Sequence, residues 1–398
     1  MYRTITIILI IYSLIGCSLK DHETKMTDTP LKIATFNVSM DATNYVGRDT
    51  KRATNQVLKT QLKNGNQQIK NIAEIIQRTR PDIILLNEFD YIENPKEGVE
   101  LFIKDYLNVS QHSDLKAIDY PYYYYAPVNT GKASPYDLTG DGKATGTQGD
   151  AWGFGFFEGQ YGMMLLSRYP INTQDIRTFQ NFKWKDMPNA LRPIVPSTGK
   201  FFYNDEVWSQ YPLSSKSHWD VPVNVNGQIV HVLASHPTPP VFDGPEDRNG
   251  TKNHDEVRFW LDYITPKSAD YIYDDNGNFG GLTPQSRFVI MGDLNSSATE
   301  GNSRKEAIGG LLTSPITNDV LIPQSRGGDL HTPENTLSKY HTAFWGMRAD
   351  YVLPSTFGID VLNNGVYWPQ KDQADYRLIK DRAASSDHRM VWSSLLLK

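Results

Sequence analysis

The chain has 398 residues, 39% of them hydrophobic, and is therefore long enough to bury a large core. Its net charge is -5 with a pI near 6.0. This charge excludes the overall basic character of a dedicated duplex-binding protein, although local basic patches remain compatible with it. No repeat and no long Pro/Ser/Gly tract divides the sequence, so we expect a single domain with large insertions over residues 31–398.

The N-terminus has the composition of a bacterial lipoprotein signal peptide. In residues 1–17, Arg3 precedes an apolar run that is too short to span a bilayer and that ends in Leu-Ile-Gly-Cys. This tetrapeptide resembles a lipobox, which implies cleavage before Cys17 and lipidation of its thiol. The alternative is an N-terminal anchor with an incidental cysteine. Residues 18–30 are polar and without periodicity, and they are predicted to form a flexible tether. We therefore expect a lipoprotein of the cell envelope, at the outer membrane or cell surface.

The first elements predicted are a strand, a helix and a second strand. LKIATFNV at residues 31–38 predicts a strand with Asn37 at its polar end. Apolar residues with helical spacing predict an amphipathic helix over residues 66–80. PDIILLNE then predicts a buried strand that ends at Glu88. A turn-forming Asn37 and a surface Glu88 are the structural alternatives.

Residues 108–160 form a predicted insertion rich in Tyr, Gly and Asp. Within it, Asp137, Thr139 and Asp141 occupy positions one, three and five of a segment similar to half of a calcium loop. Gln148 stands where an acidic residue is expected at position twelve. The segment is compatible with a Ca²⁺ site and also with a Gly/Asp-rich turn.

The next apolar segments are EGQYGMMLLSRYPI at residues 158–171 and IVHVLASH, which ends at His236. Four prolines follow within residues 237–250, and they prevent the sheet from continuing. We expect this restricted loop to shape a site, with a core histidine as the alternative reading of His236. Asn253 is expected to cap the helix that follows.

FVIMGDLNSS at residues 288–297 is predicted to be a buried strand with a polar end. Because side chains alternate along a strand, we expect Asp293 and Asn295 to share a face while Leu294 points to the core. Gly292 is expected to leave room for a substrate near the backbone. The alternative is a strand end with an Asx turn.

Two segments near the C-terminus complete the pattern. RADYVLPS predicts a strand that starts at Asp350, and SSDHRMVW places Asp387 and His388 before the last strand. Six apolar segments therefore border an Asn, Glu, His or Asp side chain.

This ordered series resembles the endonuclease/exonuclease/phosphatase superfamily over residues 31–396. The motifs that carry the resemblance are Asn37, Glu88, His236, Asp293-x-Asn295, Asp350-Tyr and Ser-Asp387-His388. The resemblance implies an α/β (α+β) fold in which two packed, mostly antiparallel β-sheets are flanked by helices in a four-layer α/β/β/α sandwich.

The resemblance also implies roles for these side chains. Mg²⁺ or Mn²⁺ would be held by Glu88, with help from Asn37 and Asp387. Asp293 would act on the attacking water, and Asn295 would position it. The remaining catalytic residues implied are two histidines facing the phosphoryl oxygens and a carboxylate that holds the second of them, namely His236, His388 and Asp350.

We expect an exported, lipid-anchored phosphoesterase that acts as a monomer on a small or lipid phosphodiester or phosphomonoester. The acidic net charge and the aromatic insertion favour such a substrate. A secreted nuclease of the same fold, with nucleic acid as substrate, is the second hypothesis. The third is a non-catalytic surface binding protein, against which the complete set of polar residues argues. The sequence indicates no protein partner.

Overall fold

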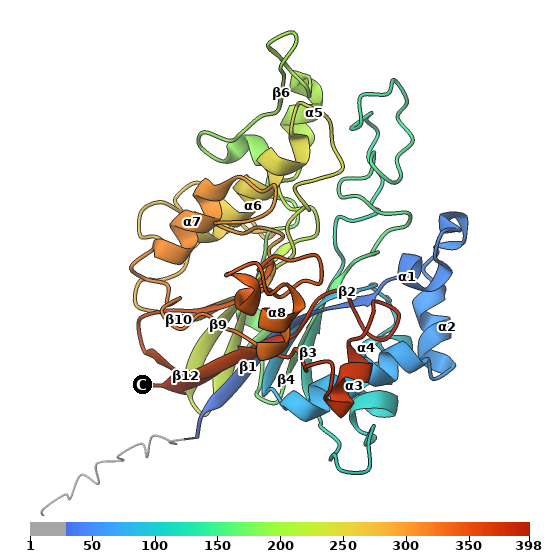
Figure 1. Ribbon diagram of the computed structural model, residues 1–398. Helices are drawn as coiled ribbons and strands as arrows, with labels where there is room; N and C mark the ends of the chain where they lie inside the picture. Colours follow the sequence, from blue (N-terminus) through green and yellow to red (C-terminus); the bar gives the residue numbers. More distant parts are fainter. Residues whose placement is uncertain (1–28) are drawn as a thin grey trace, which may run out of the picture.

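The computed structural model describes residues 29–398, so the predicted signal peptide, Cys17 and most of the predicted tether lie outside the described residues. Two β-sheets pack face to face, and helices cover their outer faces (Figure 1). The predicted four-layer α/β/β/α architecture is therefore confirmed. Within residues 29–398, no helix combines the length and apolar character needed to cross a membrane.

The first sheet has six strands, and all neighbouring strands run antiparallel except the central pair β1 and β2. In spatial order they are β12 (Ile359–Val366), β13 (Val391–Leu397), β1 (Leu31–Met40), β2 (Ile83–Phe89), β4 (Met163–Ser167) and β3 (Tyr122–Tyr125). The insertion contributes the edge strand β3, which pairs with β4.

The second sheet has five strands, and only β9 and β10 run parallel. In spatial order they are β11 (Asp350–Pro354), β10 (Arg287–Asp293), β9 (Gln228–Ser235), β8 (His218–Val225) and β5 (Arg177–Thr178). A separate ribbon is formed by β6 (Ile194–Val195) and β7 (Lys200–Phe201). Both large sheets are mostly antiparallel, as the sequence predicts.

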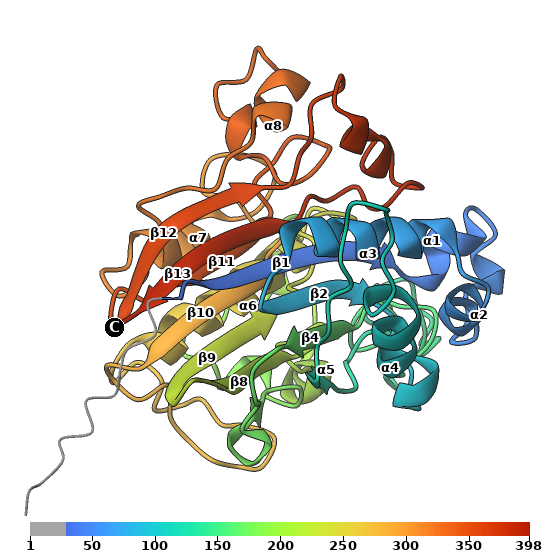
Figure 2. The same cartoon turned by 90° about the horizontal axis from the view of Figure 1, so that it is seen from below.

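Helices cover the outer face of each sheet (Figures 1 and 2). The first sheet is covered by α3 (Gln67–Thr79) and α4 (Val99–Phe102), and the second by α6 (Arg248–Ile264) and α7 (Lys305–Thr313). Short helices occupy the connections, namely α1 (Ala42–Val46), α2 (Val57–Lys63), α5 (Asp205–Gln210) and α8 (Arg326–His331).

The alternation of side chains along β10 explains why its sequence is apolar throughout. Val289 and Met291 belong to the core between the two sheets. Phe288 and Ile290 point the other way and pack in the core beneath α6, which includes Trp260. A strand that is buried on both faces has a continuous apolar sequence. Each fully buried large apolar side chain contributes about 1.5–3 kcal/mol to the free energy of unfolding.

The helix predicted over residues 66–80 is confirmed as α3. The Asn66 side chain caps it by accepting a hydrogen bond from the Gln68 backbone N–H at 2.8 Å, and Arg80 ends it in the left-handed conformation. The predicted start of α6 is wrong, because the helix begins at Arg248 and Asn253 lies inside it. The Asn253 amide instead donates to the backbone oxygens of Thr238 and Leu294, at 2.8 and 3.0 Å.

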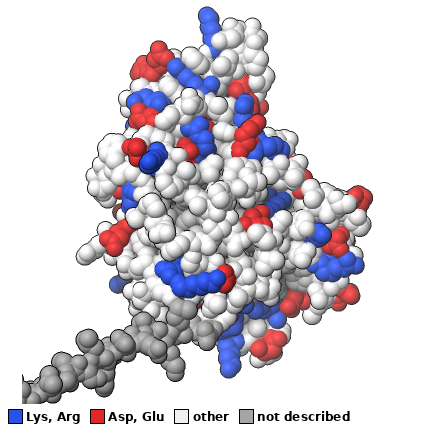
Figure 3. Space-filling model, turned by 90° about the vertical axis from the view of Figure 1, so that its left-hand side faces the viewer, with Lys and Arg blue, Asp and Glu red and all other residues white. Residues whose placement is uncertain are grey.

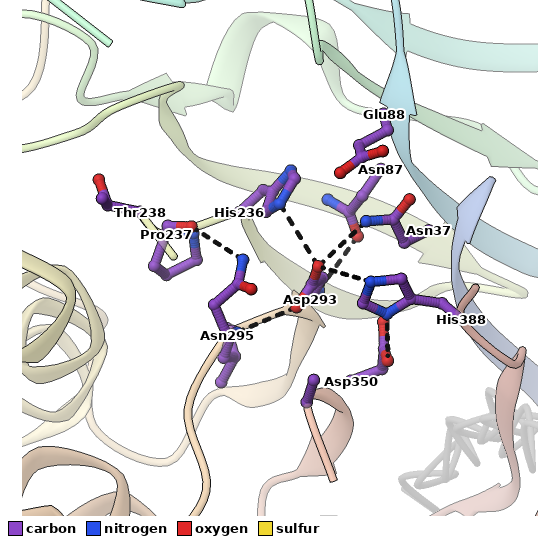
Figure 4. Close-up of polar contacts among 12 residues, drawn as sticks. Asn37, Asn87, Glu88, His236, Pro237, Thr238, Asp293, Asn295, Asp350 and His388 are labelled. Carbon is purple, nitrogen blue, oxygen red and sulfur yellow. Dashed lines mark hydrogen bonds and ion pairs between the residues drawn. The ribbon is translucent and has the colours of Figure 1, made fainter. Parts of the chain in front are cut away.

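The sheet topology brings the polar strand ends to one edge of the sandwich. Parallel β1 and β2 end on the same side, as do parallel β9 and β10. Strand β11 runs antiparallel to β10 and pairs Asp350 with Asp293, so it starts where β10 ends. The residues delivered to this edge include Asn37, Glu88, His236, Asp293, Asp350 and His388 (Figure 4). Asp387 directly precedes His388 and lies at the same edge.

Candidate active site

Strand β10 carries Asp293 to the edge of the second sheet. The preceding residue, Gly292, has φ +146°, and a Cβ there would lie 1.9 Å from the backbone oxygen of Ser235. Gly292 therefore allows β10 to approach the end of β9, and the expectation that it leaves room for a substrate is wrong. Asp293 is buried, with 1% of its surface exposed.

Three side chains from three different parts of the chain converge on one oxygen of Asp293 (Figure 4). Asn37 Nδ2 donates to Asp293 Oδ2 at 3.0 Å. The Nε2 atoms of His236 and His388 lie 3.4 and 3.5 Å from the same oxygen. The predicted catalytic residues Asp293, His236 and His388 are thus brought together, with Asn37 beside them.

These neighbours fix the charge of Asp293. Burial raises the pKa of Asp293, but His388, His236 and Asn37 outweigh it and hold the pKa far below its usual range. The carboxylate is therefore a permanent hydrogen-bond acceptor and a weak base. It can orient a water molecule throughout the physiological pH range.

His388 and Asp350 form a buried dyad, as the sequence predicts. His388 Nδ1 lies 2.9 Å from Asp350 Oδ2, which also accepts a hydrogen bond from Thr342 Oγ1 at 2.7 Å. Burial lowers the pKa of His388, but the carboxylates of Asp350 and Asp293 outweigh it and raise the pKa to about 10. The dyad therefore presents an imidazolium to the site at neutral pH.

His236 differs from His388 in charge. It is 3% exposed, and no described residue hydrogen-bonds to its Nδ1 atom. Burial and the neighbouring Lys216 ammonium lower the pKa of His236 to about 4. At neutral pH His388 therefore presents positive charge to the site, whereas neutral His236 offers an N–H group.

Asn295 reaches Asp293 by a different route from the one predicted. Strand β10 ends at Asp293, and Asn295 has a left-handed φ of +50°, so the two residues do not share the face of a continuing strand. The Asn295 backbone N–H donates to Asp293 Oδ1 at 3.0 Å, as in an Asx turn. Its side-chain Nδ2 donates to the Pro237 backbone oxygen at 3.2 Å and so ties Asp293 to the loop after His236.

A second, more open set of charges lies next to Asp293 and its partners. We call Asn37, His236, Asp293, Asp350 and His388 the inner group, and Asp41, Glu88, Arg382 and Asp387 the outer group. The Arg382 guanidinium lies 3.4 Å from Asp387, 3.6 Å from Asp41 and 3.8 Å from Glu88. The side chains of Glu88 and Asp387 are 18% and 27% exposed, whereas that of Asp41 is buried, so part of this group faces solvent.

Burial raises the pKa values of two carboxyl groups in the outer group. Burial, followed by the charge of Asp41, raises the pKa of Glu88 to about 7. Burial also raises the pKa of Asp41, whose Oδ2 atom has no hydrogen-bond partner among residues 29–398. Glu88 sits at a left-handed φ of +58°. A non-glycine residue in this conformation stores strain, which is common where a side chain must be aimed at a site.

The donor chemistry of the outer group fits a hard divalent cation. Glu88 and Asp387 offer carboxylate oxygens whose ion-pair partner among the described residues is Arg382 alone, and Mg²⁺ prefers such ligands. Asn37 is already engaged, because its Nδ2 binds Asp293 and its Oδ1 accepts the Ser39 N–H at 3.2 Å. Asp293, Asp350 and His388 place ligand atoms within 4.8 Å of one another and could also hold a metal, although the dyad bond occupies two of them.

Sequence reasoning missed three residues of this region. Asn87 joins the two sheets, since its Oδ1 accepts the Asp293 N–H at 3.1 Å. Asp41 and Arg382 complete the outer group. Asn87 directly precedes Glu88 and Asp41 follows β1, so their positions at strand ends were the available signal. Arg382 lies in a loop, and no sequence pattern identifies it.

The calcium-loop residues lie outside both groups. Asp137 accepts hydrogen bonds from the backbone N–H groups of Thr139, Gly140 and Gly142, at 2.7–3.1 Å. Asp141 accepts one from Lys143 at 2.9 Å. These bonds favour the Gly/Asp-rich turn, and Ca²⁺ binding at Asp137, Thr139 and Asp141 stays a prediction.

Solved structures resemble this chain at low sequence identity. An endonuclease/exonuclease/phosphatase from Beutenbergia cavernae DSM 12333 has 18% identity and a TM-score of 0.49, covering 93% of this chain and 72% of the other. A mutant beta toxin from Staphylococcus aureus with bound magnesium ions has 15% identity and a TM-score of 0.46, covering 92% and 99%. The human Nocturnin catalytic domain with bound sulfate has 12% identity and a TM-score of 0.44, covering 93% and 95%.

No curated protein matches the chain in sequence. The family comparison is decisive, because the endonuclease/exonuclease/phosphatase family matches residues 34–388. This range contains every residue of the inner and outer groups. The chain therefore belongs to the endonuclease/exonuclease/phosphatase family.

Proposed function

We propose that the protein is a divalent-metal-dependent phosphoesterase that hydrolyses a phosphodiester or phosphomonoester by in-line attack of water. The convergence of Asn37, His236 and His388 on Asp293 Oδ2, next to the carboxylates of Glu88 and Asp387, is the observation that supports it. Hydrolysis needs an oriented nucleophile and positive charge at the phosphoryl oxygens. The inner group can orient the nucleophile, and His388 contributes positive charge at the phosphoryl oxygens.

Each inner residue has a task in this proposal. Asp293 accepts a hydrogen bond from the attacking water, whose oxygen forms the new bond to phosphorus as the bond to the leaving oxygen breaks. The water becomes acidic late in a loose transition state, so a weak base is sufficient to take its proton. The leaving oxygen takes a proton from solvent. Imidazolium His388, held by Asp350, and neutral His236 donate hydrogen bonds to phosphoryl oxygens.

The cation and Asn295 complete the proposal. Glu88 and Asp387 would hold Mg²⁺ or Mn²⁺, with Asn37 fixing Asp293 beside it. A divalent ion bound there polarises the phosphoryl oxygens and neutralises their developing charge. The Asn295 amide, held by Pro237, would position the water next to Asp293.

A small or lipid phosphoester is the substrate class we favour. On the face shown in Figure 3, the Lys and Arg side chains of the described residues are interspersed with Asp and Glu, with no continuous basic strip. The net charge of -5 also disfavours nucleic acid as the main substrate. Hydrolysis of DNA by the same site is the alternative outcome of the assay.

The test is a substrate panel with metal controls. The purified protein is assayed on p-nitrophenyl phosphate, bis(p-nitrophenyl) phosphate, sphingomyelin and plasmid DNA, each with Mg²⁺, Mn²⁺, Ca²⁺ or chelator. We expect chelator-sensitive hydrolysis of at least one small or lipid ester. Absence of chelator-sensitive turnover on every substrate would contradict the proposal, and turnover of DNA alone would favour the nuclease.

We also propose that Cys17 is the lipidated N-terminus of the exported protein, anchored in the cell envelope. The lipobox-like Leu-Ile-Gly-Cys supports this. Wild type should incorporate labelled palmitate and sediment with membranes, whereas Cys17→Ser should do neither. Unchanged labelling in the variant would contradict lipidation at this residue.

A further inference from the structure

Lys216 is an almost fully buried lysine whose ammonium has no ion-pair partner within residues 29–398. It lies two residues before β8 and is 5% exposed. Among residues 29–398, no side chain or backbone group forms a hydrogen bond or ion pair with its Nζ atom. A buried charge that is not paired costs free energy, and such groups persist where they bind something.

The backbone around Lys216 is held rigidly from several sides. Asn129 of the insertion donates its backbone N–H to the Lys216 oxygen at 2.9 Å and its Nδ2 to the Ser214 oxygen at 2.9 Å. The Ser215 N–H donates to buried Glu256 Oε1 at 2.6 Å. A Cβ at Gly153 would lie 2.0 Å from the Ser215 oxygen, so the insertion packs directly on this segment.

The charges that act on Lys216 belong to the active site. Burial is the largest influence and lowers the pKa of Lys216, whereas Glu256, Glu88 and Asp293 act in the opposite direction. The Lys216 ammonium in turn is the main charged group that lowers the pKa of His236. Lys216 is therefore in electrostatic reach of residues from both the inner and the outer group.

The segment that carries Lys216 reaches the site, because Ser215 Oγ donates to the His236 backbone oxygen at 3.4 Å. From this position, its burial and its lack of a partner, we propose that Lys216 is a catalytic residue whose ammonium binds a non-bridging oxygen of the substrate phosphoryl group. This inference rests on the proposed function. Lys216 transfers no proton and forms no covalent bond, and it donates hydrogen bonds that strengthen as negative charge gathers on the phosphoryl oxygens. The insertion, through Asn129 and Gly153, fixes the position of the segment that carries it.

The same inference predicts how the ammonium affects stability. Lys216→Met keeps the length of the side chain and removes a buried charge without a partner. The variant should unfold at the same temperature as wild type or higher. Replacing an unpaired buried charge with an apolar side chain removes its desolvation cost and so raises the free energy of unfolding. A residue with a purely structural role would instead lower the unfolding temperature when changed.

Binding of inorganic phosphate, measured by calorimetry with Mg²⁺ present, tests the proposal independently of turnover. We expect Lys216→Met to raise the Kd of phosphate at least about 10-fold and to lower kcat/KM about 10²-fold, as for loss of one donor to a reacting oxygen. Lys216→Arg should recover part of the phosphate affinity and part of kcat/KM. Lys252→Met is the matched control, because Lys252 is also buried but already donates to the Trp152 oxygen at 3.2 Å and lies 4.2 Å from the Tyr211 ring.

The outcomes separate this inference from the proposed function. A phosphate Kd that stays within about threefold of wild type in folded Lys216→Met would overturn the inference, as would an equal loss in Lys252→Met. Failure of both Lys216→Met and Lys216→Gln to fold would overturn it as well. Weakened phosphate binding without turnover of any ester by wild type would support the Lys216 contact while contradicting the proposed function.

Discussion

The inner and outer groups lie side by side at one edge of the sandwich, yet they are built in different ways. Inner residues are buried, and their polar atoms mostly bind one another, as the three contacts to Asp293 Oδ2 show. In the outer group the carboxylates of Asp41, Glu88 and Asp387 meet a single guanidinium, at 3.4–3.8 Å. The inner group thus satisfies most of its own polar atoms, with His236 Nδ1 and Asp350 Oδ1 as exceptions among the described residues. The outer group has more negative than positive charge.

This difference indicates which part of the site is pre-organised and which depends on a bound ion. Buried hydrogen-bonded networks hold their geometry because breaking one contact leaves another group unsatisfied. Like charges in a partly buried cluster repel one another, and a cation relieves that repulsion. Variants of the inner group should therefore change the chemical step, and variants of the outer group should change the affinity for metal.

The largest effect is expected from Asp293→Asn. Because the amide cannot accept the water proton and removes the charge that His388 faces, we expect kcat to fall about 10³-fold while the Kd of Mg²⁺ changes little. Steady-state kinetics and calorimetry measure the two quantities. Asp220→Asn is the matched control, since Asp220 is another buried aspartate of the second sheet, 2.7 Å from His231. It should lower the unfolding temperature and leave kcat largely intact, and equal losses of kcat in both variants would contradict the special role of Asp293.

The next effect is expected from Glu88→Gln in the outer group. Replacing a carboxylate ligand with an amide should raise the Kd of Mg²⁺ at least about 10-fold, because hard divalent ions favour charged oxygen donors. At saturating Mg²⁺ the variant should regain much of its kcat, since the inner group is intact. Calorimetry of Mg²⁺ binding checks this, and an unchanged Kd would show that the cation is held elsewhere, for example by the buried Asp293, Asp350 and His388.

The third prediction concerns acid stability, because burial lowers the pKa values of His236 and His218 to about 4. Both histidines stay neutral in the folded protein but are protonated below pH about 6.5 when the chain unfolds. The unfolded state then binds more protons, so the free energy of unfolding should fall as the pH drops from about 6.5 to about 4. Each histidine contributes a slope of about 1.4 kcal/mol per pH unit in this window.

Denaturant titrations between these pH values test that slope. His236→Gln and His218→Gln should each reduce the slope by about 1.4 kcal/mol per pH unit, because each variant lacks one histidine that takes up a proton on unfolding. The two variants should differ in activity, because the His218 ring is held by Ser214 Oγ at 2.7 Å and the Glu256 oxygen at 2.9 Å and packs on Phe259 and Trp260 of α6. If His218→Gln lost as much activity as His236→Gln, the distinction between the inner group and the surrounding core would fail.

The fold and most of the inner group could be predicted from the sequence because they depend on local patterns. Strands buried on both faces are apolar throughout, as in residues 83–86 and 288–291, and a polar residue then marks where each strand leaves the core. Glu88 and Asp293 follow this rule. The prediction that β1 ends at Asn37 is wrong, because the strand continues to Met40 and Asn37 lies inside it. The convergence of these three side chains follows from the parallel pairs at the centre of each sheet.

What could not be predicted depends on contacts between distant segments. Asn253 has the side chain of a helix cap, but two backbone oxygens from other loops bind it and the helix starts earlier. Asn295 leaves the strand because its backbone N–H turns back to Asp293. Arg382 reaches Asp41 and Glu88 from a loop near the other end of the chain, and local sequence carries no signal for such a contact.

The smallest effect is expected from Arg382→Gln, and its sign is the sharpest test of the comparison. Partial loss of water contact lowers the pKa of Arg382, but the Glu88, Asp387 and Asp41 carboxylates outweigh it and raise the pKa. The guanidinium therefore stays charged beside the proposed cation ligands. A fixed positive charge there opposes the binding of another cation. We expect Arg382→Gln to lower the Kd of Mg²⁺ about threefold and to destabilise the metal-free protein, which loses its only described counter-charge for these carboxylates.

Lys380→Gln is the matched control for this variant, because Lys380 is an exposed cation two residues away that forms no ion pair within residues 29–398. It should leave both the Mg²⁺ affinity and the metal-free stability unchanged. If Arg382→Gln instead weakened Mg²⁺ binding, the guanidinium would be organising the carboxylates rather than competing for them. The outer group would then be pre-organised by the protein in the same way as the inner group, and the distinction between the two would no longer hold.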